Sequence, residues 1–156
     1  MLKTILINPD AKLRKKSVPV TLEQVKTGTF NQLISDMKET MIAKDGIGLA
    51  APQVNESIRL IVINTKDGVL PLINPQIIKR SWRKCLGEEG CLSAPGIYGQ
   101  VKRYYGIVVK AYSPEGEAVS FKATGLFARV IQHEIDHLDG ILFIDKAKKL
   151  EQPNKA

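Results

Sequence analysis

Two histidines four residues apart are the part of this sequence best suited to chemistry. His133 and His137 are the only histidines in the chain, and with Glu134 they form the pattern H-E-x-x-H. Residues four apart lie on one face of a helix, so both imidazoles can bind one metal ion while Glu134 acts as an acid or base beside it. The same short pattern can also arise by chance on a solvated helix face. Because no other histidine exists, a third protein ligand must be a cysteine or a carboxylate.

Cys91 is the best candidate for that third ligand, whereas Cys85 is expected to be structural. Cys91 lies within an expected loop, residues 88–96, where glycines and a proline let the backbone approach closely around a single thiol. One thiolate and two imidazoles would leave the fourth tetrahedral position to water, as in catalytic rather than structural sites. The metal would then produce hydroxide near neutral pH, and Glu134 could take and return the proton.

Residues 46–53 form a second unusual segment, with two glycines, no charge and an amide, Gln53, at the end. The simplest interpretation is a tight helix-to-strand connection that leaves Gln53 in solvent. The functional interpretation is a substrate-binding edge, where small residues let a peptide backbone lie close and the Gln53 amide donates to an oxyanion.

Two helices must position these groups. Apolar residues recur at helical spacing over residues 30–44, and Thr29 with Gln32 fits a capping box at the start. The second helix spans residues 125–138, with Thr124 as a candidate N-cap. It is apolar over so much of its circumference that we expect it to be largely buried. Its polar side chains would then need partners, which favours a metal site over a solvated face.

Most of the remaining chain reads as short β-branched segments separated by turn residues. The expected strands are residues 59–64, 70–74, 75–80, 106–112 and 118–123. Strands that come in runs rather than alternating with helices indicate an α+β fold. We expect antiparallel or mixed sheets packed around a central metal-binding helix, with a second, N-terminal helix.

Length and composition are those of one globular domain. The chain has 156 residues, 44% of them hydrophobic, and no apolar run approaches the roughly 20 residues that span a membrane. We expect residues 1–147 to form a single catalytic domain and residues 148–156 a polar, flexible tail. The apolar run at the N-terminus is too short for a signal peptide, which predicts a cytoplasmic protein with reduced cysteines.

The net charge of +7 comes from basic clusters scattered along the chain, one of them Arg80 with Arg83 and Lys84. Solvated surface is the simpler interpretation, and attraction to a polyanion such as ribosomal RNA is the alternative. No recognised nucleic-acid motif accompanies these clusters, so a sequence-specific reader of nucleic acid is not expected.

Three segments together resemble the signature motifs of the peptide deformylases. Residues 46–53, 89–93 and 132–140 match GΦGΦAAxQ, EGCΦS and HExxH, in the order found in that family. The resemblance implies removal of the formyl group from N-formylmethionine at the start of nascent polypeptides, with release of formate.

The resemblance also implies roles for the metal-binding residues. Cys91, His133 and His137 match the family's ligands, and Glu134 matches its general acid/base. The family's physiological metal is usually Fe(II), with Zn, Ni or Co able to replace it, whereas the ligand set alone would suggest zinc. Metal-bound hydroxide is expected to attack the formyl carbon, after which Glu134 protonates the departing amine.

Substrate contacts follow from the same resemblance. Gln53 and the backbone N–H of Leu92 match the donors that stabilise the oxyanion. Ile47, Gly48 and Gly90 are expected to contact the substrate backbone and the methionine side chain.

The sequence departs from the family at one position near the methionine pocket. Some members carry an arginine seven residues after the metal-binding cysteine, where this chain has Tyr98, and Arg129 stands on the predicted metal helix. The family implies a monomer that acts on N-formylmethionyl peptides without DNA or membrane partners. A transient ribosome contact could involve Lys146, Lys148 and Lys149.

Three other functions remain open. A zincin-type metalloprotease also uses H-E-x-x-H, and it would take its third ligand from Asp139, Asp145 or Glu151 and leave Cys91 without a role. A deformylase-like protein that binds nascent chains or RNA without catalysis is the second alternative. The third is a basic RNA-binding domain with an accidental motif, which the low aromatic content of 6% and the lack of aromatic stacking clusters in the sequence disfavour.

Overall fold

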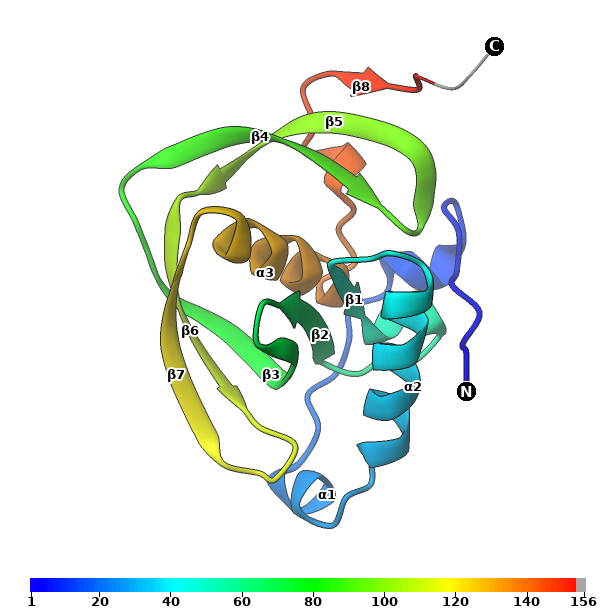
Figure 1. Cartoon of the computed structure of the whole chain (residues 1–156), viewed down its shortest axis with the longest axis vertical. Helices are drawn as coiled ribbons and strands as arrows, with labels where there is room; N and C mark the ends of the chain where they lie inside the picture. The colour runs from blue at the N-terminus through cyan, green and yellow to red at the C-terminus, as the bar shows by residue number, and fades with distance from the viewer. Residues whose placement is uncertain (154–156) are drawn as a thin grey trace.

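The computed structural model describes residues 1–153 and contains two antiparallel β-sheets with three α-helices (Figure 1). The larger sheet has the order β1-β2-β3-β6-β7. Its strands are β1 (Gly48–Ala50), β2 (Leu60–Thr65), β3 (Gly68–Arg80), β6 (Gly106–Tyr112) and β7 (Ala118–Thr124). The smaller sheet has the order β4-β5-β8, with β4 (Lys84–Cys91), β5 (Ala94–Tyr104) and β8 (Leu150–Glu151).

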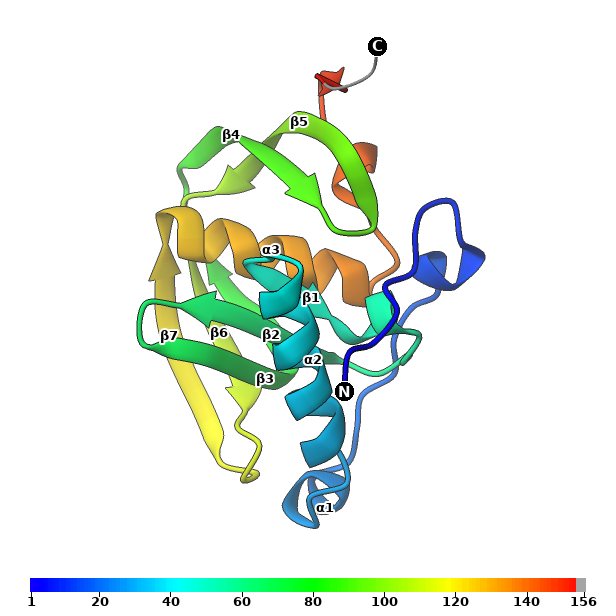
Figure 2. The same ribbon diagram turned by 45° about the vertical axis from the view of Figure 1, so that its right-hand side comes forward.

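The helices are α1 (Leu22–Lys26), α2 (Asn31–Ala43) and α3 (Gly125–Leu138). The described residues also form three short 3₁₀ turns: η1 (Ala11–Arg14), η2 (Ala51–Val54) and η3 (Phe143–Asp145). In both ribbon views α3 lies between the two sheets, with the β4–β5 hairpin on one side and β1–β2 on the other (Figures 1 and 2). The expected α+β fold around a central helix is confirmed. None of the helices within residues 1–153 is long and apolar enough to span a membrane.

Two apolar cores hold α3 and α2 against the larger sheet. The first joins Ile131, Ile135 and Leu138 of α3 to Ile61 and Leu72 on the sheet, and all five are at most 8% exposed. The second joins α2 to the opposite face of the sheet through residues such as Met37 and Met41. Because α3 is packed on both sides, its polar side chains sit in a dry environment, as the sequence predicted.

The central helix has the predicted bounds, but its N-terminus is not capped as expected. Thr124 occupies the N-cap position without a side-chain hydrogen bond. The first backbone N–H, of Gly125, instead donates to the carbonyl of Tyr105 at 2.9 Å. At the other end, Arg59 donates to the Leu138 carbonyl at 3.2 Å, so the residue just before β2 satisfies the helix terminus.

The capping box predicted for the first long helix is wrong. α2 begins at Asn31 with Phe30 as its N-cap, so Thr29 lies one residue too early to cap it. A T-x-x-Q capping box does form at Thr21 and Gln24, at the start of the short helix α1.

The strand predictions hold for β2, β6 and β7 to within a residue. Residues 70–80 form one strand rather than two, because Asn74 adopts a positive φ of 51° and makes a bulge instead of a turn. Its side-chain amide bonds the backbone N–H and C=O of Val20, which fixes the bulge.

The β4–β5 hairpin and the short strands β1 and β8 were not predicted. Residues 88–96 therefore belong to a hairpin rather than a loop. β8 pairs with β5, so residues 150–151 of the expected flexible tail have a defined backbone partner. Residues 154–156 of that tail lie outside the described residues.

Candidate active site and metal centre

The structure brings three donor side chains from two elements to one point. Cys91 is the last residue of β4, and His133 and His137 lie one turn apart on α3. Their ligand atoms all lie within 4.8 Å of one another, and the Cys91 Sγ is 3.3 Å from the His137 Nε2. In a tetrahedral site with metal–ligand bonds of about 2.0–2.3 Å, neighbouring donors are roughly 3.5 Å apart. The spacing therefore fits a single metal ion.

His133 is oriented for this role by Glu89. The Nδ1 of His133 lies 2.8 Å from a Glu89 carboxylate oxygen, which leaves Nε2 to face the thiol. Burial opposes protonation of His133, but hydrogen bonds with Cys91 and Glu89 outweigh it and raise its pKa to about 10. The Glu89 carboxylate and the Cys91 sulfur thus favour a positive charge at this point, and a bound metal ion would take the place of the proton, because a ligating histidine is neutral.

His137 has the opposite electrostatic character. Burial is the largest effect and places its pKa well below the usual value, so the ring is neutral. Its Nδ1 is buried with no hydrogen-bond partner, while Nε2 faces Cys91. A neutral imidazole can offer the lone pair of one ring nitrogen to a metal ion, which makes it the metal-binding form of histidine.

Glu89 is the centre of a buried charge network that sequence reasoning missed. Its two oxygens accept from two nitrogens of Arg103, each at 2.9 Å, and from Arg129 at 2.7 Å, in addition to His133. Arg103 also pairs with Asp136 on α3. The only sequence signal was the position of Glu89 within the same motif as Cys91. Its partner Arg103 comes from β5, and only the hairpin places it there.

Glu134 lies in the same pocket with a free carboxylate oxygen. It is 4% exposed, and its Oε2 is buried without a hydrogen-bond partner. Burial is the main reason that its pKa is raised to about 7. A carboxyl that titrates near neutral pH can both take and return a proton. Gly48 lies directly against it, because a Cβ at that position would be 2.6 Å from the Glu134 Oε1.

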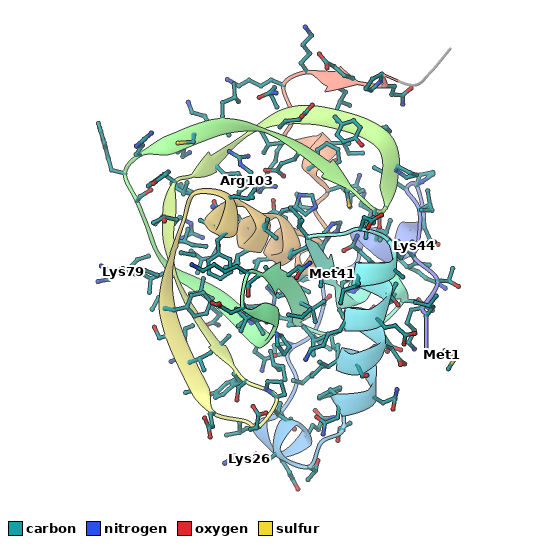
Figure 3. All side chains as sticks on the ribbon, viewed as in Figure 1. Met1, Lys26, Met41, Lys44, Lys79 and Arg103 are labelled. Atoms are coloured by element: carbon teal, nitrogen blue, oxygen red, sulfur yellow. The ribbon has the colours of Figure 1, made fainter. Side chains whose placement is uncertain are left out.

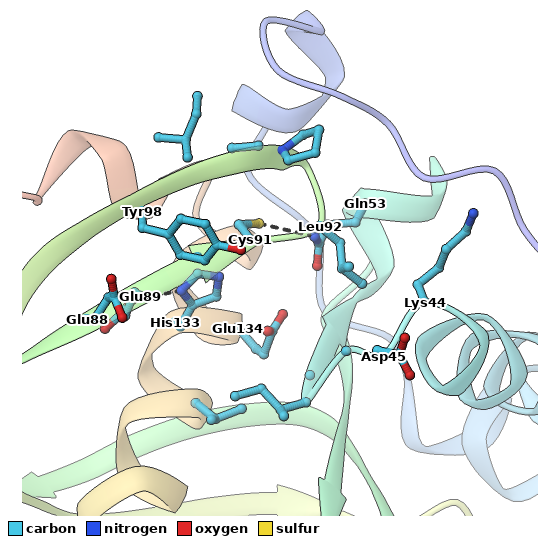
Figure 4. A pocket seen from close by; sticks show the side chains of 18 of the residues that line it. Lys44, Asp45, Gln53, Glu88, Glu89, Cys91, Leu92, Tyr98, His133 and Glu134 are labelled. Atoms are coloured by element: carbon cyan, nitrogen blue, oxygen red, sulfur yellow. Dashed lines mark hydrogen bonds and ion pairs between the residues drawn. The ribbon is translucent and has the colours of Figure 1, made fainter. Parts of the chain in front are cut away.

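Gln53 is buried rather than solvated, so the simplest interpretation of residues 46–53 is wrong. Its Oε1 accepts from the backbone N–H of Ala50 at 2.9 Å. This bond turns the amide nitrogen toward the site, where it donates to the Ser93 hydroxyl at 3.1 Å and lies 3.5 Å from the Cys91 sulfur (Figure 4). Sequence reasoning gave Ser93 no role, although it lies in the same motif. Leu92 lies between Cys91 and Ser93 in the sequence and lines the same pocket.

These groups line a pocket of about 500 Å³. Its wall includes the predicted substrate residues Ile47, Gly48 and Gly90, of which Ile47 is 54% exposed. Tyr98 stands at the pocket with 40% exposure, and its ring packs where a Gly90 side chain would be. Arg129 also lines the pocket.

Arg129 is not free to bind a ligand. Its guanidinium donates to Glu89, to the carbonyl of Val101 at 2.8 Å and to the carbonyl of Cys85 at 2.8 Å. Tyr98, at 40% exposure, is therefore the more accessible of the two side chains, and Arg129 supports the wall of the pocket.

Comparison with known proteins agrees with this site. The family model described as Polypeptide deformylase matches residues 2–153. The chain belongs to the polypeptide deformylase family. It is 46% identical over 143 residues to the peptide deformylase of Syntrophomonas wolfei, covering 92% of this chain and 91% of that protein.

Solved structures of the family have the same fold. The peptide deformylase of Thermotoga maritima superposes with a TM-score of 0.91 at 40% identity, covering 96% of this chain and 99% of that one. The class I type b enzyme of Acinetobacter baumannii bound to Met-Ala-Ser gives a TM-score of 0.89 at 35% identity, covering 94% and 98%. The zincin alternative is set aside, because the family match runs over nearly the whole chain.

Proposed function

We infer that this chain hydrolyses the formyl amide of N-formylmethionyl peptides and releases formate. The observation that carries the inference is the Cys91, His133 and His137 group with the unpartnered carboxylate oxygen of Glu134 in one pocket. Membership of the deformylase family supports the same reaction.

Cys91, His133 and His137 would hold one divalent metal, which we propose to be Fe(II), with Zn, Ni or Co as substitutes. When bound, this ion would supply Lewis-acid polarisation of the formyl group and a water of lowered pKa. The buried, hydrogen-bonded imidazole of His133 and the neutral imidazole of His137 support the assignment of both as ligands beside Cys91.

The protein's own groups would manage the proton and the developing charge. Glu134, with a pKa near 7, would take a proton from the attacking water and pass it to the departing amine. The Gln53 amide is held by Ala50 with its nitrogen toward the thiol, where it can donate to an oxyanion, and we assign the Leu92 N–H the same task.

The substrate would lie along the open edge of the larger sheet. β1 is the edge strand, and Gly48 presents no side chain between a bound peptide and Glu134. Ile47 and Gly90 would contact the substrate on either side of the pocket. The Met-Ala-Ser complex of the Acinetobacter baumannii enzyme supports a peptide of this kind as the ligand.

The deciding experiment is formate release from a formyl-Met-Ala peptide, with metal content assayed on the same anaerobic sample. We expect turnover that is lost on chelation. Glu134→Gln should abolish most turnover while metal stays bound, and retained turnover in that variant would disprove the role of Glu134. A metal-loaded chain that releases no formate would overturn the substrate.

The wider cellular role is also a proposal. We expect a monomer with residues 1–147 as the catalytic domain. We expect it in the cytoplasm, because nascent chains are its substrate. Lys146 already pairs with Asp136, so a ribosome contact at this end would depend more on Lys148 and Lys149.

A further inference from the structure

The corner where β3 passes into β4 carries exposed basic and aromatic side chains that the proposed reaction does not use. Trp82 is 100% exposed there, and it is the only tryptophan in the chain. We call this surface the basic corner and define it by six residues: Arg80, Trp82, Arg83, Lys84, Tyr104 and Tyr105. None of them lines the active-site pocket.

The positive charge of the basic corner is not neutralised. Residues 68–87 contain no Asp or Glu, and neither do residues 90–114 and 118–133, which supply the adjoining strands. Among the described residues, Arg80, Arg83 and Lys84 form no ion pair. Their N–H groups are therefore available to an anionic ligand.

Aromatic rings hold these cations in place. The Arg83 guanidinium lies 4.7 Å from the centroid of the Tyr105 ring. The Lys84 ammonium lies 4.7 Å from the Tyr104 ring, and the Arg80 guanidinium lies 5.7 Å from the same ring. Cation–π contacts of this kind reduce the freedom of long side chains, so the charges are arranged before a ligand arrives. Trp82 alone among these aromatic residues makes no such contact and leaves its indole to solvent.

A hollow of about 270 Å³ adjoins the basic corner, between the ends of β3, β6 and β7. Lys79, Arg80 and Lys122 line it, together with the hydroxyl residues Ser81 and Thr124. Figure 3 shows Lys79 pointing outward from this part of the molecule. Exposed cations, an aromatic platform and a hollow lined in part by cationic and hydroxyl residues thus lie side by side.

We propose that the basic corner binds an unpaired segment of RNA. A base would stack on Trp82, and the phosphates beside it would contact Arg80, Arg83 and Lys84, since stacking platforms beside cations are how proteins bind single strands. A lipid surface would contact only what protrudes and leave the hollow unfilled. An acidic peptide would offer no base for Trp82. Only the choice of RNA rather than DNA rests on the proposed function, because nascent chains are synthesised on ribosomes, which contain RNA.

The test follows the fluorescence of Trp82 itself, because no other tryptophan contributes. The full chain is titrated with a short oligouridylate at several salt concentrations. We expect saturable quenching that weakens with salt. Trp82→Ala, measured by anisotropy of labelled RNA, should weaken binding about 5- to 150-fold, the range that stacking of one base contributes.

The charge contribution is tested with a matched pair of triple variants. The first variant combines Arg80→Gln, Arg83→Gln and Lys84→Gln. It should reduce the magnitude of the slope of log K against log salt by about 2, because each lost phosphate contact contributes roughly 0.7. Lys15→Gln, Lys26→Gln and Lys66→Gln change the net charge equally at exposed sites elsewhere and should leave the slope nearly unchanged. The Tm of both variants should equal that of the unchanged chain, which verifies an intact fold, and formate release should also be unchanged.

Several results would overturn the proposal. Absence of quenching would show that no base stacks on Trp82. Equal loss of RNA affinity in both triple variants would show that only the overall charge attracts RNA. Quenching by an oligodeoxynucleotide but not by RNA would overturn the choice of RNA. A blue shift with anionic phosphatidylglycerol vesicles, without binding to RNA, would make the basic corner a lipid contact. None of these outcomes depends on whether the chain deformylates peptides.

Discussion

Replacing Glu89 by glutamine should weaken both the metal site and the fold. The carboxylate is 5% exposed and is the shared acceptor for His133, Arg103 and Arg129. Breaking a buried ion pair by removing one partner costs ~3–5 kcal/mol. Arg103 keeps Asp136 as a second partner, and the glutamine oxygen can still accept from one donor, so we expect the lower end of the range.

The expected effects are large enough to measure by two assays. A loss of about 3 kcal/mol in the metal-free chain would lower its Tm by roughly 6–12 °C at this chain length. Because Glu89 fixes the ring of His133, metal affinity measured by chelator competition should fall about 10- to 100-fold. Glu88→Gln is the matched control, since Glu88 is the neighbouring exposed carboxylate and the change in charge is the same.

The contribution of Glu89 to the stability of the folded state depends on pH. Burial opposes ionisation of Glu89, but hydrogen bonds from Arg103 and His133 outweigh it and hold its pKa below the ordinary value of 4.5. A lowered pKa stabilises the folded state above about pH 4.5, and the contribution is lost as pH falls toward the folded-state pKa. The difference between the original chain and Glu89→Gln should thus be largest near neutral pH. Equal metal affinity and equal unfolding free energy in Glu89→Gln and Glu88→Gln would refute this account of the site.

Three further substitutions test the rest of the pocket. Burial raises the pKa of Glu134 to about 7, so the metal-free chain should lose up to roughly 3 kcal/mol of stability as pH rises from 4.5 to 7. Glu134→Gln should remove that loss, which urea unfolding at pH 5 and pH 8 measures. An unchanged pH profile would contradict it. Gly48→Ala would place a Cβ 2.6 Å from the Glu134 carboxylate, and kcat should fall on the order of 100-fold with metal content unchanged; wild-type kcat would show that the carboxylate has room to move. Cys91→Ser should lose bound metal by elemental analysis, because a hydroxyl is a poorer ligand than a thiolate, and retained metal would point to a different third ligand.

Local chemistry made much of this protein predictable from sequence. The i, i+4 spacing of His133 and His137 fixes their common face once a helix forms, and the apolar residues around them decide that this helix is buried. Cys91 and Gln53 could be assigned because glycine-rich motifs surround them. The bounds of α3, β6 and β7 follow from the same local periodicity.

The errors occurred where local signals were weak or duplicated. β4 carries glycines and charged residues instead of alternating apolar ones, so the hairpin that delivers Cys91 was taken for a loop. The T-x-x-Q pattern appears twice in succession, and only the observed position of Asn31 shows that Thr21, not Thr29, caps a helix.

The sequence by itself determined the α+β class, the central helix and the metal-binding triad, because these depend on residue types at short range. Only the tertiary structure decided that Glu89 orients His133, that Arg103 balances Glu89 and that Arg129 is bound in the pocket wall. Only the tertiary structure, too, placed Trp82 fully in solvent. These facts depend on the register of β4 against β5 and on the packing of that hairpin over α3. The contacts join residues 14 to 44 positions apart, which no local pattern encodes.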